Sequence, residues 1–186
     1  MTRKALVAGL ALLGFAAAGC GGGSAETPAP EPPASETAAP PSTPRTGPAK
    51  ATDIPDKCAI VSEAQWQSLG ADQKPRQRDS NGRTGCQYQK GEAGRPGWAA
   101  FIAVTGERSY DEELQRRVDP TGTADLGGYP ATEYRTTGGC LLVVNVSDKG
   151  FLLVNAGPTG PEDPGLDLCQ QAQQFGQAAI QNLPNA

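Results

Sequence analysis

The sequence contains no histidine, and its only methionine is the first residue. Without an imidazole the chain cannot form a Ser/His/Asp or Cys/His catalytic arrangement, a histidine general base or a histidine-ligated metal site. Basic residues are also outnumbered, with 16 Lys and Arg residues against 20 Asp and Glu residues. Because nucleic acids are bound by clustered positive charge, this balance argues against a nucleic-acid partner.

Long apolar runs are scarce, and the most extended one stands near the start of the chain. Arg3 and Lys4 precede an apolar stretch over 5–18 that is too short to span a bilayer, as in an export signal. It ends in Ala-Ala-Gly-Cys20, and small residues before a cysteine resemble the lipobox of bacterial lipoproteins. We expect residues 1–19 to be a signal peptide and Cys20 to carry a diacylglycerol. The alternative is an ordinary signal peptide with another cleavage site, which leaves Cys20 removed or as a free thiol.

Large apolar residues are almost missing from the segment that follows. Residues 21–55 hold nine of the 17 prolines, and Ile54 is their only large aliphatic residue. Such a segment cannot bury enough apolar surface to offset the entropy of ordering it. We therefore predict that residues 20–55, from the lipidated cysteine onward, form a disordered tether that is partly polyproline II.

The rest of the chain, residues 56–186, has the size of one domain and contains four cysteines. An even number of cysteines in an exported chain is typical of disulfides, and four cysteines allow three pairings. Pairing Cys58 with Cys86 and Cys140 with Cys169 closes two separate loops, and we favour it, although spacing alone leaves the connectivity open. A zinc site is the other use of four cysteines, but no Cys-x-x-Cys spacing is present.

Three helices are predicted in this domain. Two of them open with a capping box, formed by Ser62 with Gln65 and by Ser109 with Glu112. They predict a helix over 63–69 and a second helix that runs to about Val118 and presents Tyr110, Leu114 and Val118 on one face. A third helix is predicted from about 167 to 182, with one apolar face formed by Leu168, Ala172, Phe175, Ala179 and Leu183.

Strands account for most of the remaining pattern. Residues 98–105 are apolar on both faces, which predicts a central strand covered on both sides. Strands are also predicted over 86–89, 131–136, 140–146 and 151–155. The last two flank a predicted four-residue hairpin loop, and the polar stretch 72–85 is predicted to be a loop. The order of elements indicates an α+β fold, a mainly antiparallel sheet packed with helices and joined by two disulfides.

The contexts of the four cysteines resemble a known family. They read Asp-Lys-Cys58-Ala-Ile-Val-Ser, Gly-Cys86-Gln-Tyr, Gly-Gly-Cys140-Leu-Leu-Val-Val-Asn-Val and Leu-Cys169-Gln-Gln-Ala. With the lipobox and the tether, they resemble actinobacterial lipoproteins that contain domain of unknown function 3558; Tyr88 stands where Trp is more usual. The resemblance implies an exported, membrane-anchored envelope protein and carries no activity. A looser similarity of architecture links the domain to two-disulfide extracellular sensor domains of actinobacterial Ser/Thr kinases.

Acidic clusters are the candidates for carboxylate catalysis and for calcium binding. Asp111, Glu112 and Glu113 could serve as paired carboxylates for acid/base or glycosidase chemistry. Their position in the first turn of a helix, with arginines four residues after Glu112 and Glu113, favours a structural role. Residues 119–125 lack the ligand spacing of a calcium loop. We assign no catalytic residue, metal site or cofactor.

Two further groups could bind ligands. Lys74, Arg76, Arg78 and Arg83 could bind phosphates, lipid head groups or acidic glycans, but the neighbouring Asp72 and Asp79 favour a solvated loop. Five aromatic residues could line a pocket or simply fill the core: Trp66, Trp98, Tyr110, Tyr129 and Tyr134. No ligand-binding residue is assigned from the sequence.

The combined features favour a monomeric, non-enzymatic, sensor-like binding module on the outer face of the cytoplasmic membrane. It would contact the membrane through its lipid anchor and bind an unknown envelope ligand or protein. Two alternatives stay open: a cell-wall or lipid hydrolase that uses Asp or Glu alone, and an accessory subunit of an envelope complex.

Overall fold

A computed structural model describes residues 43–161 and 165–186, which belong to one compact unit. The expected signal peptide, Cys20 and most of the expected tether lie outside the described residues. Ten elements follow one another: α1 (Glu63–Ser68), β1 (Gln73–Ser80), β2 (Arg83–Lys90), β3 (Trp98–Thr105), α2 (Tyr110–Gln115), β4 (Gly122–Asp125), β5 (Pro130–Thr136), β6 (Gly139–Ser147), β7 (Gly150–Pro158) and α3 (Leu168–Asn182).

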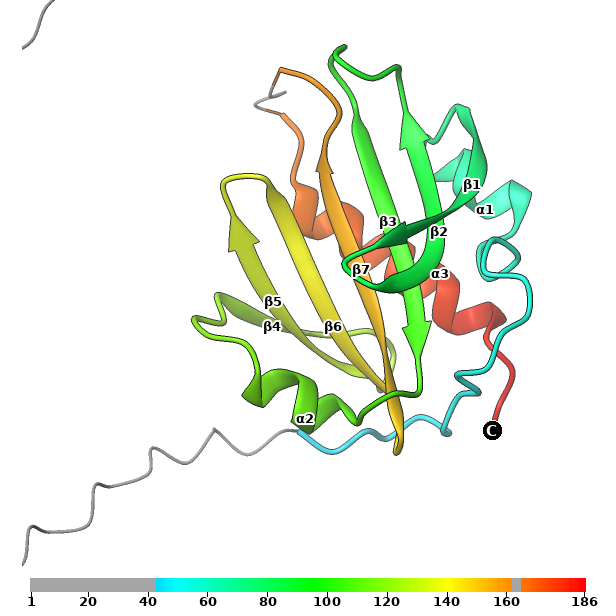
Figure 1. The fold of residues 1–186 in the computed structure, drawn as a ribbon, viewed down its shortest axis with the longest axis vertical. Coiled ribbons are helices and arrows are strands. Elements are labelled where there is room, and N and C mark those ends of the chain that lie inside the picture. Colours follow the sequence, from blue (N-terminus) through cyan, green and yellow to red (C-terminus); the bar gives the residue numbers. More distant parts are fainter. Residues whose placement is uncertain (1–42, 162–164) are drawn as a thin grey trace, which may run out of the picture. The chain divides into compact units, whose positions relative to one another are not determined.

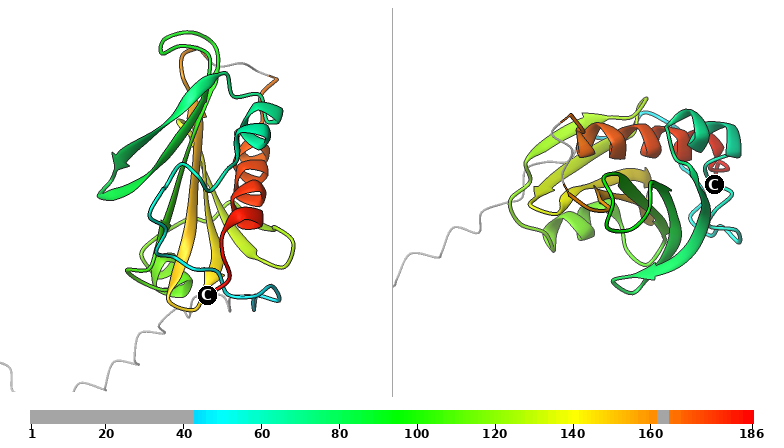
Figure 2. Two further views of the ribbon diagram at one scale, coloured as in Figure 1. Left: turned by 90° about the vertical axis from the view of Figure 1, so that its right-hand side faces the viewer. Right: turned by 90° about the horizontal axis from the view of Figure 1, so that it is seen from above.

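The seven strands form one antiparallel sheet in the order β1-β2-β3-β7-β6-β5-β4 (Figure 1). Helices α1 and α3 lie on one side of this sheet, and α2 lies on the other side together with the β1–β2 hairpin (Figure 2). The α+β prediction is therefore confirmed. Strand β3 lies between β2 and β7, as expected for a strand that is apolar on both faces.

Two separate cores hold the layers together. The main core, between α3 and the sheet, contains fully buried residues that include Tyr88, Ile102, Leu142 and Phe175. The second core is smaller and lies under α2, where Phe101, Tyr110, Tyr134, Val143, Phe151 and Leu153 pack together. Buried side chains from both layers pack together in the space between α3 and the sheet.

The helix predictions are largely confirmed. Both capping boxes are present, and α3 begins after its N-cap residue Asp167. The expected face of α3 is buried, with Ala172, Phe175 and Ala179 fully inaccessible to solvent.

Helix α2 is shorter than expected, and the prediction for Val118 is wrong. The helix ends at Gln115, and Val118 is 80% exposed. Pro120 disfavours the helical conformation at Asp119, so the helix could not extend beyond Val118 in any case. Asp119 instead adopts a left-handed conformation with φ of 56°.

The polar stretch 72–85 forms a hairpin, so the loop prediction is wrong. Residues of β1 pair with β2 in antiparallel fashion, and Ser80 lies opposite Arg83. Between them, Asn81 and Gly82 have φ values of 51° and 74°, as a two-residue turn with both central residues at positive φ requires. Strand β1 is polar because it is an edge strand that is exposed along most of its length.

Two more strand predictions need correction. Ser147 pairs directly with Gly150, so the turn between β6 and β7 has two residues instead of four. Residues 122–125, which were not expected to be a strand, form β4 and pair with β5 at the other edge of the sheet.

Residues 45–54, here called the strap, lie along the folded domain. The N–H of Lys50 donates a hydrogen bond to the carbonyl of Val146 at 2.7 Å. Ile54 is 8% exposed and joins the main core. The prediction that the disordered tether extends to residue 55 is therefore wrong for the strap. Its backbone hydrogen bonds and one buried side chain offset the entropy of ordering it.

The favoured disulfide pairing is confirmed. Cys58 is bonded to Cys86, and Cys140 is bonded to Cys169. The first disulfide joins the coil before α1 to β2, and the second joins β6 to the first turn of α3. The second disulfide therefore ties a helix directly to the sheet, and the first ties the segment that leads into a helix.

Candidate functional site

The face of the sheet opposite α3 is covered over only part of its area. Helix α2 covers the second core, whereas the half nearer to β1 and to the end of β7 carries no helix in the described part of the chain (Figure 2). We call this uncovered half the open face. Its principal residues are Arg76, Arg78, Gln87, Gln89 and Asn155, and Phe101 of the second core lies in the same cross-strand row.

Strand register brings these residues together from distant parts of the sequence. Arg76 on β1 lies opposite Gln87 on β2, and Gln87 lies opposite Phe101 on β3. Phe101 in turn lies opposite Asn155 on β7. Because directly opposite residues point to the same face of a sheet, the four side chains form one row across four strands.

Hydrogen bonds between side chains hold the polar part of the open face in place. Arg78 donates from Nη1 to Oε1 of Gln87, and Gln87 donates from Nε2 to Oε1 of Gln89 at 2.8 Å. Arg76 donates from Nη2 to the same oxygen of Gln89 at 3.3 Å. Both glutamines are buried. The two guanidinium groups are thus positioned by amide oxygens. Because an amide is neutral, these hydrogen bonds do not compensate the positive charge of the arginines.

The open face is positively charged, although the whole chain has a net charge of −4. Within the described residues, neither Arg76 nor Arg78 forms an ion pair with a carboxylate. From Arg76 onward, the positions of β1, β2, β3 and β7 that point to this side include no Asp or Glu. An isolated cationic surface of this kind attracts anions.

A cavity of about 170 Å³ lies on the open face. Small residues form part of its lining, namely Ala99, Gly138 and Gly157, and a β-carbon on Gly157 would come within 2.8 Å of the Gly138 carbonyl oxygen. Its polar lining is supplied by Arg78, Ser80, Gln87 and Asn155. Phe101 also contributes, with its ring lying against Gly85, where a β-carbon would come within 2.7 Å of the ring.

A second cluster on this side of the sheet is centred on Glu113, which is 2% exposed. Its Oε2 accepts hydrogen bonds from Arg83 at 3.1 Å and from Arg108 at 2.8 Å, and its Oε1 accepts one from Arg117. The guanidinium carbon of Arg83 lies 5.5 Å from the centre of the Phe151 ring, within cation–π range. One carboxylate faces three arginines, so this cluster also has a net positive charge.

These contacts decide the role of the acidic run. Burial acts to raise the pKa of Glu113, but hydrogen bonds from Arg108 and Arg117 and the charges of Arg117 and Arg83 lower it overall. The group is therefore ionised at neutral pH and cannot donate a proton as a general acid. The expected Glu113–Arg117 pair is confirmed. The pairing expected for Glu112 is wrong, since Glu112 accepts from the Ser109 N–H at 2.7 Å within the capping box.

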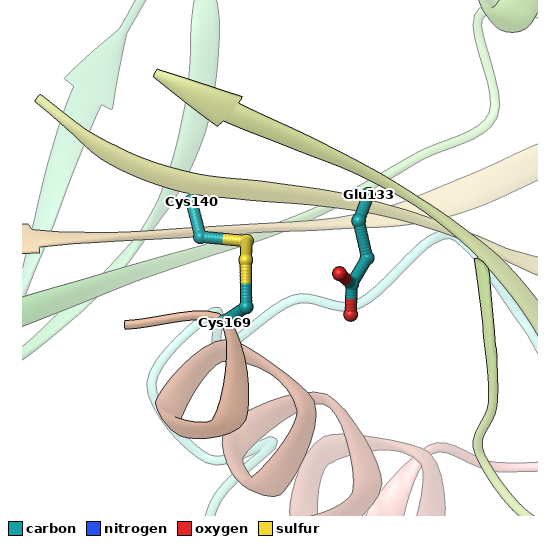
Figure 3. A group of neighbouring side chains, drawn as sticks. All are labelled: Glu133, Cys140 and Cys169. Atoms are coloured by element: carbon teal, nitrogen blue, oxygen red, sulfur yellow. A yellow bond between two sulfur atoms is a disulfide. The ribbon is translucent and has the colours of Figure 1, made fainter. Parts of the chain in front are cut away.

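One buried group contains three residues whose side chains can bind metals: Glu133, Cys140 and Cys169 (Figure 3). The two sulfur atoms form a disulfide, so they lack the thiolates that metals bind. The Glu133 carboxylate accepts a hydrogen bond from Gln173 and lies 3.9 Å from Arg135. These contacts indicate a hydrogen-bonded carboxylate beside a disulfide and not a metal centre.

A larger cavity, of about 420 Å³, opens near the start of α3. Its charged lining residues are Arg135 and Asp167, which lie 3.5 Å apart and neutralise each other. Asp167 also accepts hydrogen bonds from the N–H groups of Cys169 and Gln170 as the helix cap. The open face, with its unpaired charge, is the stronger candidate for binding.

The aromatic residues considered as pocket lining belong to the cores. Trp98 packs edge to face against Phe175, and the hydroxyl of Tyr129 donates to the Pro48 carbonyl at 2.9 Å. Trp66 packs partly buried against the main core, and Tyr110 and Tyr134 lie in the second core. Phe101 is the aromatic residue that lines the open-face cavity. Its place opposite Gln87 depends on strand pairing, which the sequence pattern alone did not reveal.

Three of the four basic residues singled out in the sequence divide between the two clusters, and Lys74, exposed near the start of β1, belongs to neither. Arg76 and Arg78 lie on the open face, and Arg83 binds Glu113. They occupy a hairpin, where alternate positions share a face, and not the solvated loop that was expected. Gln87, Gln89 and Asn155 were not identified from the sequence as part of a site.

Fold and site together define a disulfide-linked α+β domain with a cationic, partly uncovered sheet face. The chain belongs to the family described as Protein of unknown function (DUF3558), whose family model matches residues 15–182. No curated protein and no solved structure matches the chain. Among the described helices, none is long and apolar enough to cross a membrane.

Proposed function

We propose that this protein is a lipoprotein of the cell envelope, anchored on the outer face of the cytoplasmic membrane. The export signal and the cysteine after Ala-Ala-Gly support the anchor. We further propose that the domain binds an envelope ligand or partner through its open face and catalyses no reaction. The observation that carries this proposal is the pair Arg76 and Arg78, held by buried amides without any carboxylate partner in the described residues.

The contacts of the buried acids favour binding over hydrolysis. A hydrolase that relies on Asp or Glu needs a carboxylate that can accept or release a proton at the substrate. Glu113 is occupied by three arginines, and Glu133 by Gln173. If the protein were a hydrolase of this kind, a single Asp or Glu substitution would abolish turnover while leaving thermal stability unchanged.

The anchor is tested by the Cys20→Ser substitution in the full chain. The variant should incorporate no labelled lipid and should appear in the culture medium, since only the acyl chains would hold the processed protein on the membrane. Membrane retention equal to that of the wild type would contradict the anchor.

The open face is tested with isolated envelopes from which detergent has removed the membrane. The Cys20→Ser protein should be retained on these envelopes, and retention should fall as salt is added. The double variant Arg76→Glu/Arg78→Glu should be released. A control with the same charge change, Arg116→Glu/Lys149→Glu, alters two exposed residues away from the cavity. Equal retention of both double variants would show that the open face is not the binding surface.

A further inference from the structure

We propose that the open-face cavity binds one acidic sugar unit, a pyranose that carries a carboxylate or a phosphate group. This inference rests on the proposed function and specifies its ligand class. The cavity combines three features that such a unit requires: a guanidinium group without a carboxylate partner, free hydrogen-bonding side chains and an apolar surface.

The guanidinium groups would bind the anionic group. Arg78 lines the cavity, and Arg76 lies two residues before it on the same face of β1, outside the lining. Each guanidinium carries five N–H donors in a planar fork, and within the described residues each uses one side-chain acceptor, Gln87 or Gln89. The remaining donors suit a carboxylate or phosphate, which arginine binds with two parallel hydrogen bonds.

Two further side chains are placed to bind hydroxyl groups. Asn155 and Ser80 both line the cavity, and neither side chain makes a hydrogen bond within the described residues. An amide and a hydroxyl can each donate and accept, which matches the hydroxyl groups of a sugar. They approach the cavity from opposite sides, Ser80 from the β1–β2 hairpin and Asn155 from β7.

The remaining surface is apolar and small. The ring of Phe101, the methyl group of Ala99 and the backbone of Gly157 provide a surface for the C–H face of a sugar ring. A volume of about 170 Å³ is below the range of about 300 to 1,000 Å³ that is usual for drug-sized ligands. The cavity therefore fits a single sugar unit, and its open side leaves room for neighbouring units of a polymer.

The test is isothermal titration calorimetry on the full chain purified in detergent. The probes are glucuronate, glucose 1-phosphate, neutral glucose and inorganic phosphate. We expect at least one of the two acidic sugars to bind more tightly than both glucose and inorganic phosphate. Whether glucuronate or glucose 1-phosphate binds more tightly identifies the source of the anionic group, a uronate or a sugar phosphate.

Variants connect this binding to the cavity. Arg78→Gln removes a charge-assisted hydrogen bond and should weaken the binding of the acidic sugar about tenfold or more. Asn155→Asp places a carboxylate in the cavity at an exposed position, where no existing hydrogen bond is lost, and should weaken binding at least as much. Lys149→Gln removes one charge in the exposed turn between β6 and β7 and should leave affinity within about twofold. Thermal melting of each variant confirms that it is folded.

Three results would overturn the inference. The first is no binding of either acidic sugar, and the second is binding of glucose or inorganic phosphate as tight as that of the acidic sugars. The third is unchanged affinity in both Arg78→Gln and Asn155→Asp. If the chain is nevertheless retained on envelopes in a manner that depends on Arg76 and Arg78, the proposed function stands and only the ligand class is wrong.

Discussion

At the scale of single residues, Glu113 shows how one carboxylate can connect several segments. It binds Arg83 from β2, Arg108 from the loop before α2 and Arg117 from beyond the end of α2. The buried Nε atoms of Arg83 and Arg117 have no hydrogen-bond partner within the described residues. Through its three ion pairs, the negative charge of Glu113 offsets part of the repulsion among these guanidinium groups.

Replacing this carboxylate should be costly. Glu113→Gln leaves three guanidinium groups without their counter-charge, and we expect it to lower the free energy of unfolding by about 3 kcal/mol. Asp111→Asn, an exposed change in the same helical turn, should cost less than about 0.5 kcal/mol. Urea denaturation of the two variants measures the difference, and equal stabilities would contradict this role of Glu113.

The stability difference between the wild-type chain and Glu113→Gln should also depend on pH. Because the folded-state pKa of Glu113 lies below its ordinary value of 4.5, the ionised group stabilises the fold fully above that pH. Its contribution is lost as the pH falls through the lowered pKa. The stability gap between the wild-type chain and Glu113→Gln should therefore be constant near neutrality and shrink below about pH 4.5. A gap that widens in acid would reverse the assigned sign.

At the scale of elements, local signals predicted the helices better than the edge strands. Ser62 and Ser109 mark helix starts because a capping box involves residues only three positions apart. Strand β1 has no alternating apolar pattern, because its side chains are mostly exposed. Its strand conformation depends on pairing with β2. The Asn81-Gly82 pair was its one local signal, because both residues tolerate positive φ.

The start of α3 offers a test of local stabilisation. Asp167 accepts hydrogen bonds from the N–H groups of Cys169 at 2.9 Å and Gln170 at 3.1 Å, and the Gln170 contact is the leading cause that lowers its pKa. Asp167→Ala should therefore lower the free energy of unfolding by about 1 kcal/mol. Gln174→Ala, an exposed change within the same helix, should be nearly neutral or slightly stabilising. Thermal denaturation compares them, and a neutral Asp167→Ala would contradict the cap.

At the scale of the whole molecule, the sequence predicted the fold class and the disulfide pairing but not the full extent of the domain. The paired cysteines are close in sequence, with separations of 28 and 29 residues, so a local scheme was accessible. The open face could not be predicted in this way, because Arg76, Phe101 and Asn155 come together only through the order of strands β1, β2, β3 and β7. Composition likewise assigned the strap to the tether, since a single aliphatic residue carries too little weight in a Pro-rich segment.

The strap should contribute measurably to stability. A chain that begins at residue 43 should unfold at a higher temperature than one that begins at residue 56, because the second lacks the bond from Ala51 N–H to the Pro184 carbonyl and the burial of Ile54. Within the full chain, Ile54→Ala should cost about 2 kcal/mol. Pro55→Ala, an exposed neighbour, serves as the control. Identical melting temperatures for the two shortened chains would show that the folded domain begins at residue 56 and that the strap does not stabilise it.

The Cys58–Cys86 disulfide also determines how the domain would respond to mechanical load. Tension applied to the chain before residue 45 would reach the strap first and then Cys58, where the covalent bond transfers it directly to β2. The enclosed residues, which include α1 and all of β1, are bypassed by that path. Arg76 and Arg78 would therefore keep their positions on the open face while the strap is pulled away.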